Sequence, residues 1–291
     1  KTPPPPEGPR GITGLPRFGD RCPPEKIWND QETLKKSAEF SNEFFLETLW
    51  AIWEKALGDN HRELLQRIGL ENLESGFHSA RVLDLNPLME RHGKLRLNQF
   101  RIDNPQLKDT ACLVFPVRDQ KGVLQTMVFR PIRTEDDLEL KAAFYLKPGK
   151  QKYFNLAGKP KTPFGLADLK DPPGELLLCE GIRDREALRK AHQNVLATLG
   201  GLTRDQCRII KGLNPKKILI AYDGDQAGRN HTQKAIKILS GIKLKVLGLT
   251  DGEDPADLTP EQLNGLKAQS TKKWIQEQDP ADEDYEEEIT A

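Results

Sequence analysis

The chain has 291 residues, enough for one large or two modest domains that each bury a hydrophobic core. Its 44 Lys and Arg residues balance 44 Asp and Glu residues, but residues 279–291 contain seven acids and no Lys or Arg, so the rest of the chain is basic and suits a polyanionic partner. Four scattered cysteines argue against a zinc ribbon or a disulfide framework, and the lack of an apolar run of ~20 residues argues against a membrane span, so we expect a cytoplasmic protein with no membrane partner.

The first half of the chain is predicted to be an arm followed by a mixed subdomain. Residues 1–27 are rich in Pro and Gly, which favour extended or turn backbone, and we interpret them as a linker or arm. Residues 28–170 are expected to form an α+β subdomain with basic loops. A long helix with an apolar stripe ends at Gly58, and a shorter helix, "NHRELLQRIGL", precedes irregular polar sequence to about Asn104. The segments "ACLVFPVRD" and "VLQTMVFRPI" then form an antiparallel hairpin, and "AFYLKPGKQKYFN" adds a strand and a basic, aromatic turn.

Residues 171–260 have the most regular pattern. Strands are predicted in "ELLLCEG", "NVLATLG", "KKILIAYDGD" and "KLKVLGL", with helices of about ten residues between them. This alternation is typical of βαβ units and predicts an α/β domain with a doubly wound, mostly parallel sheet. Residues 261–278 are predicted to form one or two closing helices, and the acidic tail 279–291 a disordered segment or a connector.

Acidic residues follow three of the four predicted strands. Glu180 follows the first strand, and Asp223 and Asp225 follow the third. The fourth strand leads into a loop with further acids: Asp251, Glu253, Asp254 and Asp257. Because ligands bind beyond the carboxyl ends of parallel strands, we expect these side chains to gather in one crevice.

A cluster of carboxylates repels itself unless a cation is present, and carboxylate oxygens suit Mg²⁺ or Mn²⁺. The chemistry that such a site serves is phosphoryl transfer. Glycines at 181, 224 and 228 allow close approach to a phosphate, and Arg229 is placed to join them. A single D-x-D at a turn is usually a helix cap or a loop acid, but three acidic motifs within one α/β block favour a functional site.

Several motifs resemble a known family. "LLLCEGIRD", "LIAYDGDQAGR" and "GLTDGEDPADL" resemble the Toprim domain of bacterial-type primases, type IA and type II topoisomerases and some nucleases. The D-G-D-x-A-G-R motif from Asp223 to Arg229 most resembles that of DnaG-type primases. Upstream, "LLQRIGLENL", "LVFPVRDQKGVLQTMVFR" and "QKYFN" are similar to further motifs of the primase RNA polymerase core, so the resemblance covers roughly residues 60–260.

The resemblance implies a role for each matching residue. Glu180 would contact metal and act in nucleotidyl transfer, together with the catalytic acids Asp223 and Asp225. The implied metal ligands are Glu180, Asp184, Asp223, Asp225, Asp254 and Asp257. The implied nucleic-acid or nucleotide contacts are Arg130, Lys152, Tyr153, Asn155 and Arg229.

Departures from the family pattern affect the template and nucleotide contacts more than the acids. Cys112 or Leu113 stands near the place of a usual arginine, and the glycine-rich F-G-G-R becomes Met-Val-Phe-Arg, ending at Arg130. The D-P-D motif becomes Asp254-Pro-Ala, with Asp257 displaced by one position.

The resemblance implies a primase core that copies single-stranded DNA into short RNA primers from ribonucleoside triphosphates with Mg²⁺ or Mn²⁺. The divergence favours a phage, plasmid or mobile-element version, with a replicative helicase, fused or separate, as partner. Two alternatives are a Toprim nuclease or topoisomerase, and a non-catalytic nucleic-acid-binding module of a replication protein.

Overall fold

The computed structural model describes residues 31–78, 100, 111–132, 153–156, 159, 161–170 and 173–278, with side chains described from residue 42. The chain divides into two compact units, Lys1–Asn42 and Glu43–Ala291. In the first unit, residues 31–42 form the beginning of helix α1 (Gln31–Lys55). The predicted arm 1–27 and the acidic tail 279–291 lie outside the described residues. No helix in the described ranges combines the length and hydropathy needed to cross a membrane.

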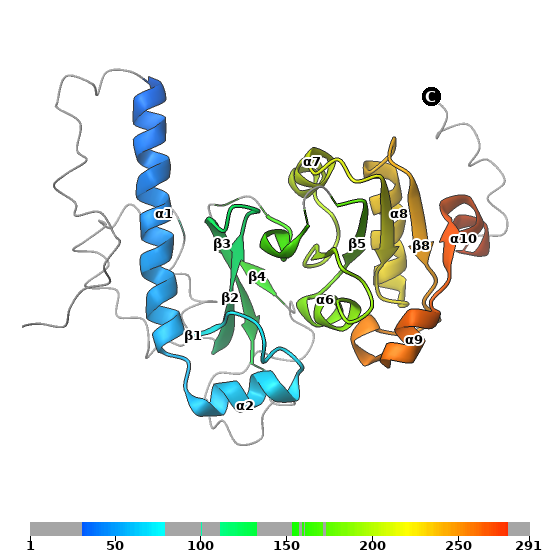
Figure 1. Ribbon diagram of the computed structural model, residues 1–291, viewed down its shortest axis with the longest axis horizontal. Helices are drawn as coiled ribbons and strands as arrows, with labels where there is room; N and C mark the ends of the chain where they lie inside the picture. Colours follow the sequence, from blue (N-terminus) through cyan, green and yellow to red (C-terminus); the bar gives the residue numbers. More distant parts are fainter. Residues whose placement is uncertain are drawn as a thin grey trace, which may run out of the picture. The chain divides into compact units, whose positions relative to one another are not determined.

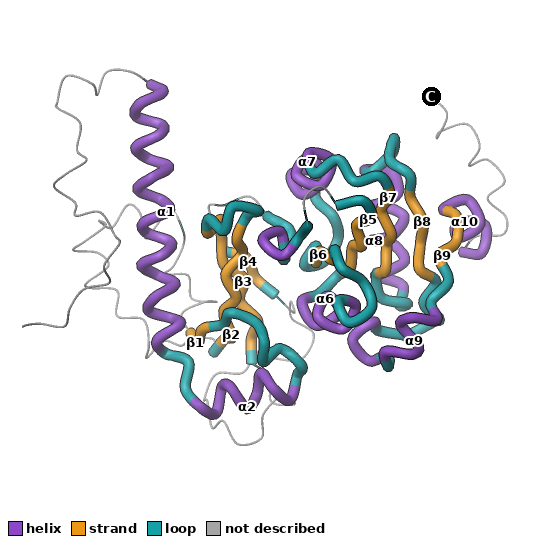
Figure 2. Tube along the Cα trace, in the orientation of Figure 1, coloured by secondary structure: helices purple, strands orange, loops and turns teal. Residues whose placement is uncertain are grey.

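The second unit contains two sheets, seen in Figures 1 and 2. The first sheet is antiparallel, with its strands in sequence order. Its strands are β1 (Gly76–His78), β2 (Cys112–Arg118), β3 (Leu124–Pro131) and β4 (Phe154–Asn155). Helix α2 (Asp59–Arg67) precedes β1, and the 3₁₀ turn η2 (Leu166–Asp168) follows β4.

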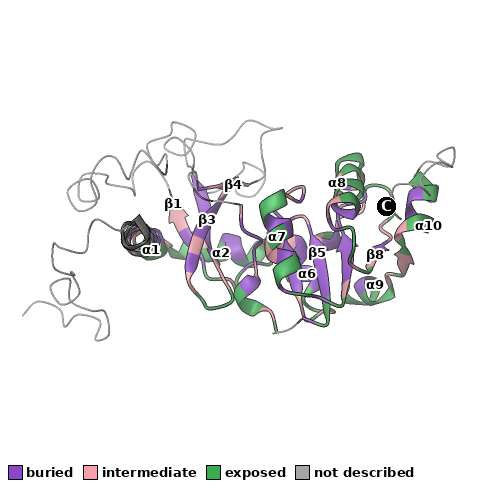
Figure 3. Ribbon diagram, turned by 90° about the horizontal axis from the view of Figure 1, so that it is seen from above, coloured by how far each residue is buried: buried purple, intermediate pink, exposed green. Residues whose placement is uncertain are grey.

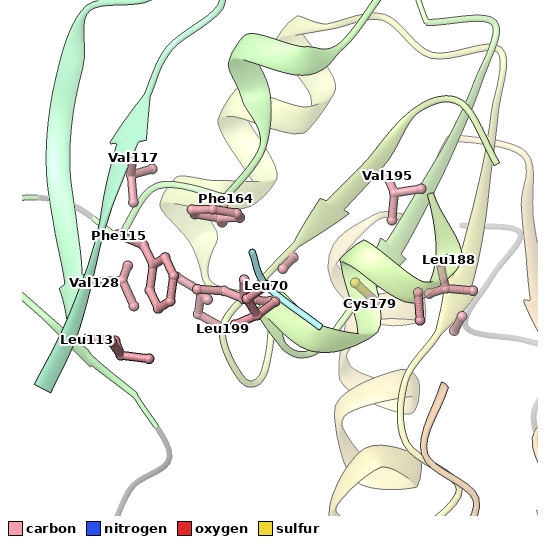
Figure 4. Packing of buried hydrophobic residues seen from close by; sticks show 14 of the residues in the cluster. Leu70, Leu113, Phe115, Val117, Val128, Phe164, Cys179, Leu188, Val195 and Leu199 are labelled. Atoms are coloured by element: carbon pink, nitrogen blue, oxygen red, sulfur yellow. The ribbon is translucent and has the colours of Figure 1, made fainter. Parts of the chain in front are cut away.

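Side chains of β2 alternate between two hydrophobic cores, because successive residues of a strand point to opposite faces. Cys112 and Val114 pack with the aromatic face of α1, where Trp53 meets Phe129 edge-on at a centroid distance of 5.1 Å. Phe115 faces the other core and meets Phe164 edge-on at 6.4 Å, as Figure 4 shows. That second core continues to the second sheet through Leu199, Cys179, Leu188 and Val195.

The second sheet has the strand order β6-β5-β7-β8-β9. Its strands are β5 (Glu175–Cys179), β6 (Val195–Ala197), β7 (Lys217–Ala221), β8 (Leu244–Leu247) and β9 (Ala268–Ser270). The first four are parallel, and β9 pairs antiparallel with β8. Its helices are α6 (Ile182–Leu188), α7 (Arg204–Gly212), α8 (Gln226–Ile238), α9 (Pro260–Gly265) and α10 (Thr271–Gln278), with the 3₁₀ turn η3 (Pro255–Asp257) after β8.

Helices cover both faces of the second sheet. On β5, Leu177 and Cys179 share a core with α6 and α9, whereas Leu176 and Leu178 share a core with α7, α8 and α10. Burial on both faces explains why these strands read as continuous apolar runs. All residues of β5 after Glu175 are buried, and Figure 3 shows this strand between helices with exposed faces. The predicted doubly wound, mostly parallel α/β fold with a preceding α+β subdomain is confirmed.

Three details differ from the sequence predictions or limit them. Strand β1 lies in sequence that was expected to be irregular, and β9 lies between α9 and α10 in the segment 261–278, where only one or two helices were expected. Both strands have three residues, too few for an alternating pattern to be recognised. Residues 143–155 were predicted to form a strand and a basic, aromatic turn; their described part begins at Tyr153, and β4 occupies the last two residues.

Candidate metal centre at the carboxyl edge of the second sheet

Three aspartates from different segments meet beyond the carboxyl ends of the parallel strands. Asp184 lies in the first turn of α6, after β5; Asp223 follows β7; and Asp254 caps η3, after β8. Each offers a carboxylate oxygen, and these three oxygens all lie within 4.8 Å of one another. We call this set the aspartate trio.

Burial and like charge both act on Asp184. Its side chain is buried, and this burial, followed by the charges of Asp254 and Asp223, raises its pKa well above the ordinary value. The backbone N–H of Gly181 donates to Asp184 Oδ2 at 2.6 Å, which opposes the rise and fixes the carboxyl at the start of α6. Three converging carboxylates with one of them buried fit a hard divalent cation, which would relieve the repulsion.

Two glycines allow the trio to form. A Cβ on Gly228 would collide with the backbone of Asp223, so a side chain here would push α8 away from the acid. A Cβ on Gly224 would collide with the Thr250 carbonyl, and the Gly224 N–H instead donates to the Glu253 carbonyl at 2.8 Å. The turn after β7 and the loop after β8 are therefore joined directly by backbone.

The predicted site residues Asp225 and Arg229 hold this junction in shape. Asp225 is the N-cap of α8, and its Oδ1 accepts from the Gly228 N–H at 2.7 Å. Arg229 Nη1 donates to the Gly224 carbonyl at 2.6 Å and to Asp251 Oδ1 at 2.7 Å. The interpretation of D-x-D as a helix cap therefore describes Asp225, while Asp223 contributes to the trio.

The predicted ligands Glu180 and Asp257 are placed outside the trio. Glu180 directly follows β5, and its Oε2 lies 3.1 Å from His231 Nδ1. Asp257 is exposed and its Oδ1 lies 3.4 Å from Arg183 Nη2. Of the six acids predicted as ligands, the structure thus gathers three within ligand distance of one another.

Among the predicted nucleic-acid or nucleotide contacts, Arg229 lies on α8, beside the second sheet, and two others lie on the first sheet. Arg130 is on β3 and Asn155 on β4, while Lys152 lies outside the described residues. Tyr153 is half-buried, and burial raises its pKa to about 12. The charge of Arg130 lowers this pKa and that of Asp184 raises it, so the tyrosine hydroxyl lies near both the first sheet and the trio.

Sequence reasoning missed two residues near Glu180. His231 lies on α8 beside the Glu180 carboxylate, and Lys161 donates from Nζ to the Leu199 carbonyl at 2.6 Å. Burial lowers the pKa of Lys161, and the charge of Glu180 opposes this shift. For His231 the available signal was its position two turns into the helix that follows D-G-D. For Lys161 the sequence carries no comparable signal, because the contact depends on how the segment after β4 meets the end of β6.

The α/β fold and its acidic edge define a Toprim-like domain, and residues 177–259 match the Toprim-like family. The chain is 27% identical over 258 residues to the DNA primase of Aquifex aeolicus. This alignment covers 84% of this chain and 50% of the Aquifex aeolicus protein. Among solved structures, it is similar to the RNA polymerase domain of Mycobacterium tuberculosis primase DnaG, with a TM-score of 0.63, 17% identity, and coverage of 82% of this chain and 87% of that one. It is also similar to a DnaG primase catalytic domain bound to ssDNA, with a TM-score of 0.58, 20% identity, and coverage of 79% and 82%.

These comparisons confirm the resemblance to bacterial-type DNA primases, with the fold of their RNA polymerase core and its Toprim domain. The chain spans half of the length of the Aquifex aeolicus relative.

Proposed function

We propose that this chain is the catalytic core of a DNA primase, which joins ribonucleotides into a short RNA primer on a single-stranded DNA template. The observation that carries the proposal is the aspartate trio, because three convergent carboxylates are suited to a divalent cation and to metal-dependent phosphoryl transfer. The similarity to DNA primases in sequence and fold supports the same reaction class.

Asp184, Asp223 and Asp254 would hold Mg²⁺ or Mn²⁺. When bound, the cation supplies charge neutralisation for the triphosphate and favours deprotonation of the attacking hydroxyl. The residues of the chain give this site its shape: Gly181 fixes Asp184, and Arg229 joins the two loops that carry the other ligands.

We assign template and nucleotide binding to the first sheet, whose strands β3 and β4 carry Arg130 and Asn155. A DnaG catalytic domain of the same fold is bound to ssDNA, which supports a similar ligand for this chain. Arg130, Lys152, Tyr153 and Asn155 remain the proposed contacts, with phosphate contacts that make affinity depend on salt. A replicative helicase partner, a cytoplasmic location and a mobile-element origin stay predictions.

The proposal is tested by extension of a single-stranded template with labelled ribonucleotides and Mg²⁺ or Mn²⁺. We expect primer products from the parent and losses of at least about 100-fold for Asp223→Asn and Asp254→Asn, since each removes a ligand charge. Asp205→Asn is the matched control, because Asp205 is an exposed acid on α7 paired with Arg208.

Other outcomes favour the alternatives. Cleaved or relaxed DNA in place of primers would indicate a nuclease or topoisomerase, and template retention in a shift assay without any product would indicate a binding module. Either result would refute the primase proposal.

A further inference from the structure

We propose that His231 is a positioning residue that holds the Glu180 carboxylate apart from the aspartate trio, so that Glu180 serves nucleotidyl transfer separately from metal binding. The inference rests on the proposed function and deepens it by dividing the acids of the site into two groups.

The contact itself is direct. His231 Nδ1 lies 3.1 Å from Glu180 Oε2, and since a carboxylate can only accept, the ring nitrogen donates. Both side chains are partly shielded from water, with exposed fractions of 32% for His231 and 20% for Glu180, so the bond is less weakened by solvent than a surface contact.

The imidazole ring is held in place by its surroundings. Tyr222 meets it edge-on, with a centroid distance of 6.3 Å and an interplanar angle of 83°, and Thr198 Oγ1 donates to the Tyr222 hydroxyl at 3.1 Å. A Cβ on Gly201 would lie 2.6 Å from His231 Cδ2, so the ring occupies space that the glycine leaves open. The ring therefore has little freedom to leave the carboxylate.

Glu180 is also constrained from the turn that follows β6. The Gly200 N–H donates to the Glu180 carbonyl at 3.2 Å, and the neighbouring Leu199 has a φ of 58°, a left-handed conformation that is costly for leucine. Lys161 donates to the Leu199 carbonyl at 2.6 Å and stabilises this turn. Its ammonium also attracts the Glu180 carboxylate.

Glu180 thus lies beside a histidine donor and a lysine charge, whereas the described acids that meet within ligand distance are the three aspartates. Loss of the His231 bond would free the Glu180 side chain to sample other rotamers, including ones directed toward a cation. Holding a reacting group in the productive geometry increases the reaction rate by a large factor. A mobile Glu180 side chain is therefore expected to lower kcat and to leave metal binding intact.

The test compares His231→Leu, which removes the donor, with His231→Asn, whose amide nitrogen can occupy the place of Nδ1. Gln233→Leu, an exposed position on the same helix, is the matched control. We expect His231→Leu to lower the kcat of primer extension about 10- to 100-fold, in the range of lost orienting partners, with KM for nucleotide and the calorimetric Kd for Mn²⁺ changed less than threefold. His231→Asn should recover most of the kcat.

Unchanged kcat in His231→Leu, or a weaker Mn²⁺ Kd that His231→Asn does not restore, would overturn the assignment. A second measurement does not depend on primer synthesis: urea unfolding of Glu180→Gln, His231→Leu and the double variant. Non-additive losses support the contact, and strictly additive losses refute it. A parent without activity would refute the proposed function, and the unfolding cycle would still decide whether the pair forms.

Discussion

A carboxylate oxygen of Asp184 lies within 4.8 Å of a carboxylate oxygen of Asp254, although Asp184 belongs to the first turn of α6 and Asp254 precedes η3. Burial, followed by the charges of Asp254 and Asp223, raises the pKa of Asp184 and favours its protonated form, so a proton and a metal ion compete for this carboxyl group.

This competition predicts the behaviour of Asp184→Asn. Because the folded-state pKa of Asp184 is raised above its unfolded value, its contribution to stability is fully present below about pH 4 and is lost as the pH rises through the folded pKa. An asparagine stays neutral, can still accept from Gly181, and should make the metal-free protein more stable than the parent at pH 7. Urea unfolding in EDTA at pH 5 and pH 7 measures this difference.

The same variant should lose its response to metal. At a concentration of 100 times its Kd, a bound ion stabilises a protein by about 2.7 kcal/mol, and the parent should gain about this much. Asp184→Asn should gain far less, because a neutral amide replaces a ligand charge. Equal metal-induced stabilisation of both proteins would remove Asp184 from the site.

A buried cation outside the site is predicted to be a main source of stability. Arg185 is fully buried, forms ion pairs with Asp168 and Glu186, and lies over the Phe164 ring. Arg185→Met should cost about 3 kcal/mol in urea unfolding, because it removes the ion pairs to Asp168 and Glu186 and the buried hydrogen bond from Arg185 Nε to the Val195 carbonyl.

Arg208→Met is the control for this prediction. Arg208 is 78% exposed and pairs with Asp205 on the same helix, so its loss should cost less than about 1 kcal/mol. Similar losses in the two variants would mean that Arg185 contributes no more than a surface pair.

Alanine substitutions at two helical glycines, one in α8 and one in α7, are predicted to change stability in opposite directions. Gly228→Ala should lower stability by about 2 kcal/mol and weaken Mn²⁺ binding at least tenfold, because the new methyl group would displace the helix from Asp223. At Gly212, at the end of α7, a Cβ meets nothing within 4 Å, so Gly212→Ala should raise stability by about 0.5–1 kcal/mol. Calorimetry of Mn²⁺ binding with urea unfolding measures both, and tight Mn²⁺ binding by Gly228→Ala would contradict the account.

Arg229 is predicted to act through loop geometry. Arg229→Ala removes the bridge between the Gly224 carbonyl and Asp251, and it should raise the Mn²⁺ Kd about tenfold in the absence of nucleotide. Arg229→Lys should recover only part of this, because a lysine cannot span two acceptors in the same fork. An unchanged metal Kd with a raised nucleotide KM would instead assign Arg229 to the nucleotide.

Much of the second sheet and the position of its acidic edge could be predicted from sequence, because buried parallel strands consist of consecutive apolar residues. The run from Ile218 to Ala221 predicts β7, and the acids that follow it predict a site at the carboxyl edge. The apolar pattern could not predict which of the acids at this edge join the aspartate trio and which make other contacts. Asp225 caps α8 and Glu180 bonds to His231, and both facts depend on local turns that an apolar pattern does not record.

The smaller misses have a similar cause. Strands β1 and β9 are set by their partners β2 and β8, and three residues do not carry a periodic signal of their own. The burial of Arg185 was also not predicted, because it depends on contacts with Asp168 and Phe164. These two residues precede β5 in the sequence, whereas Arg185 follows it.

The most direct measurement of the central claim is anomalous diffraction from crystals of the parent and of Asp184→Asn soaked in Mn²⁺. We predict a manganese peak in the parent about 2.0–2.2 Å from carboxylate oxygens of Asp184, Asp223 and Asp254, and a much weaker peak in the variant. A parent crystal without a peak between these three side chains at saturating Mn²⁺, or with manganese bound elsewhere and the trio unchanged, would contradict the account.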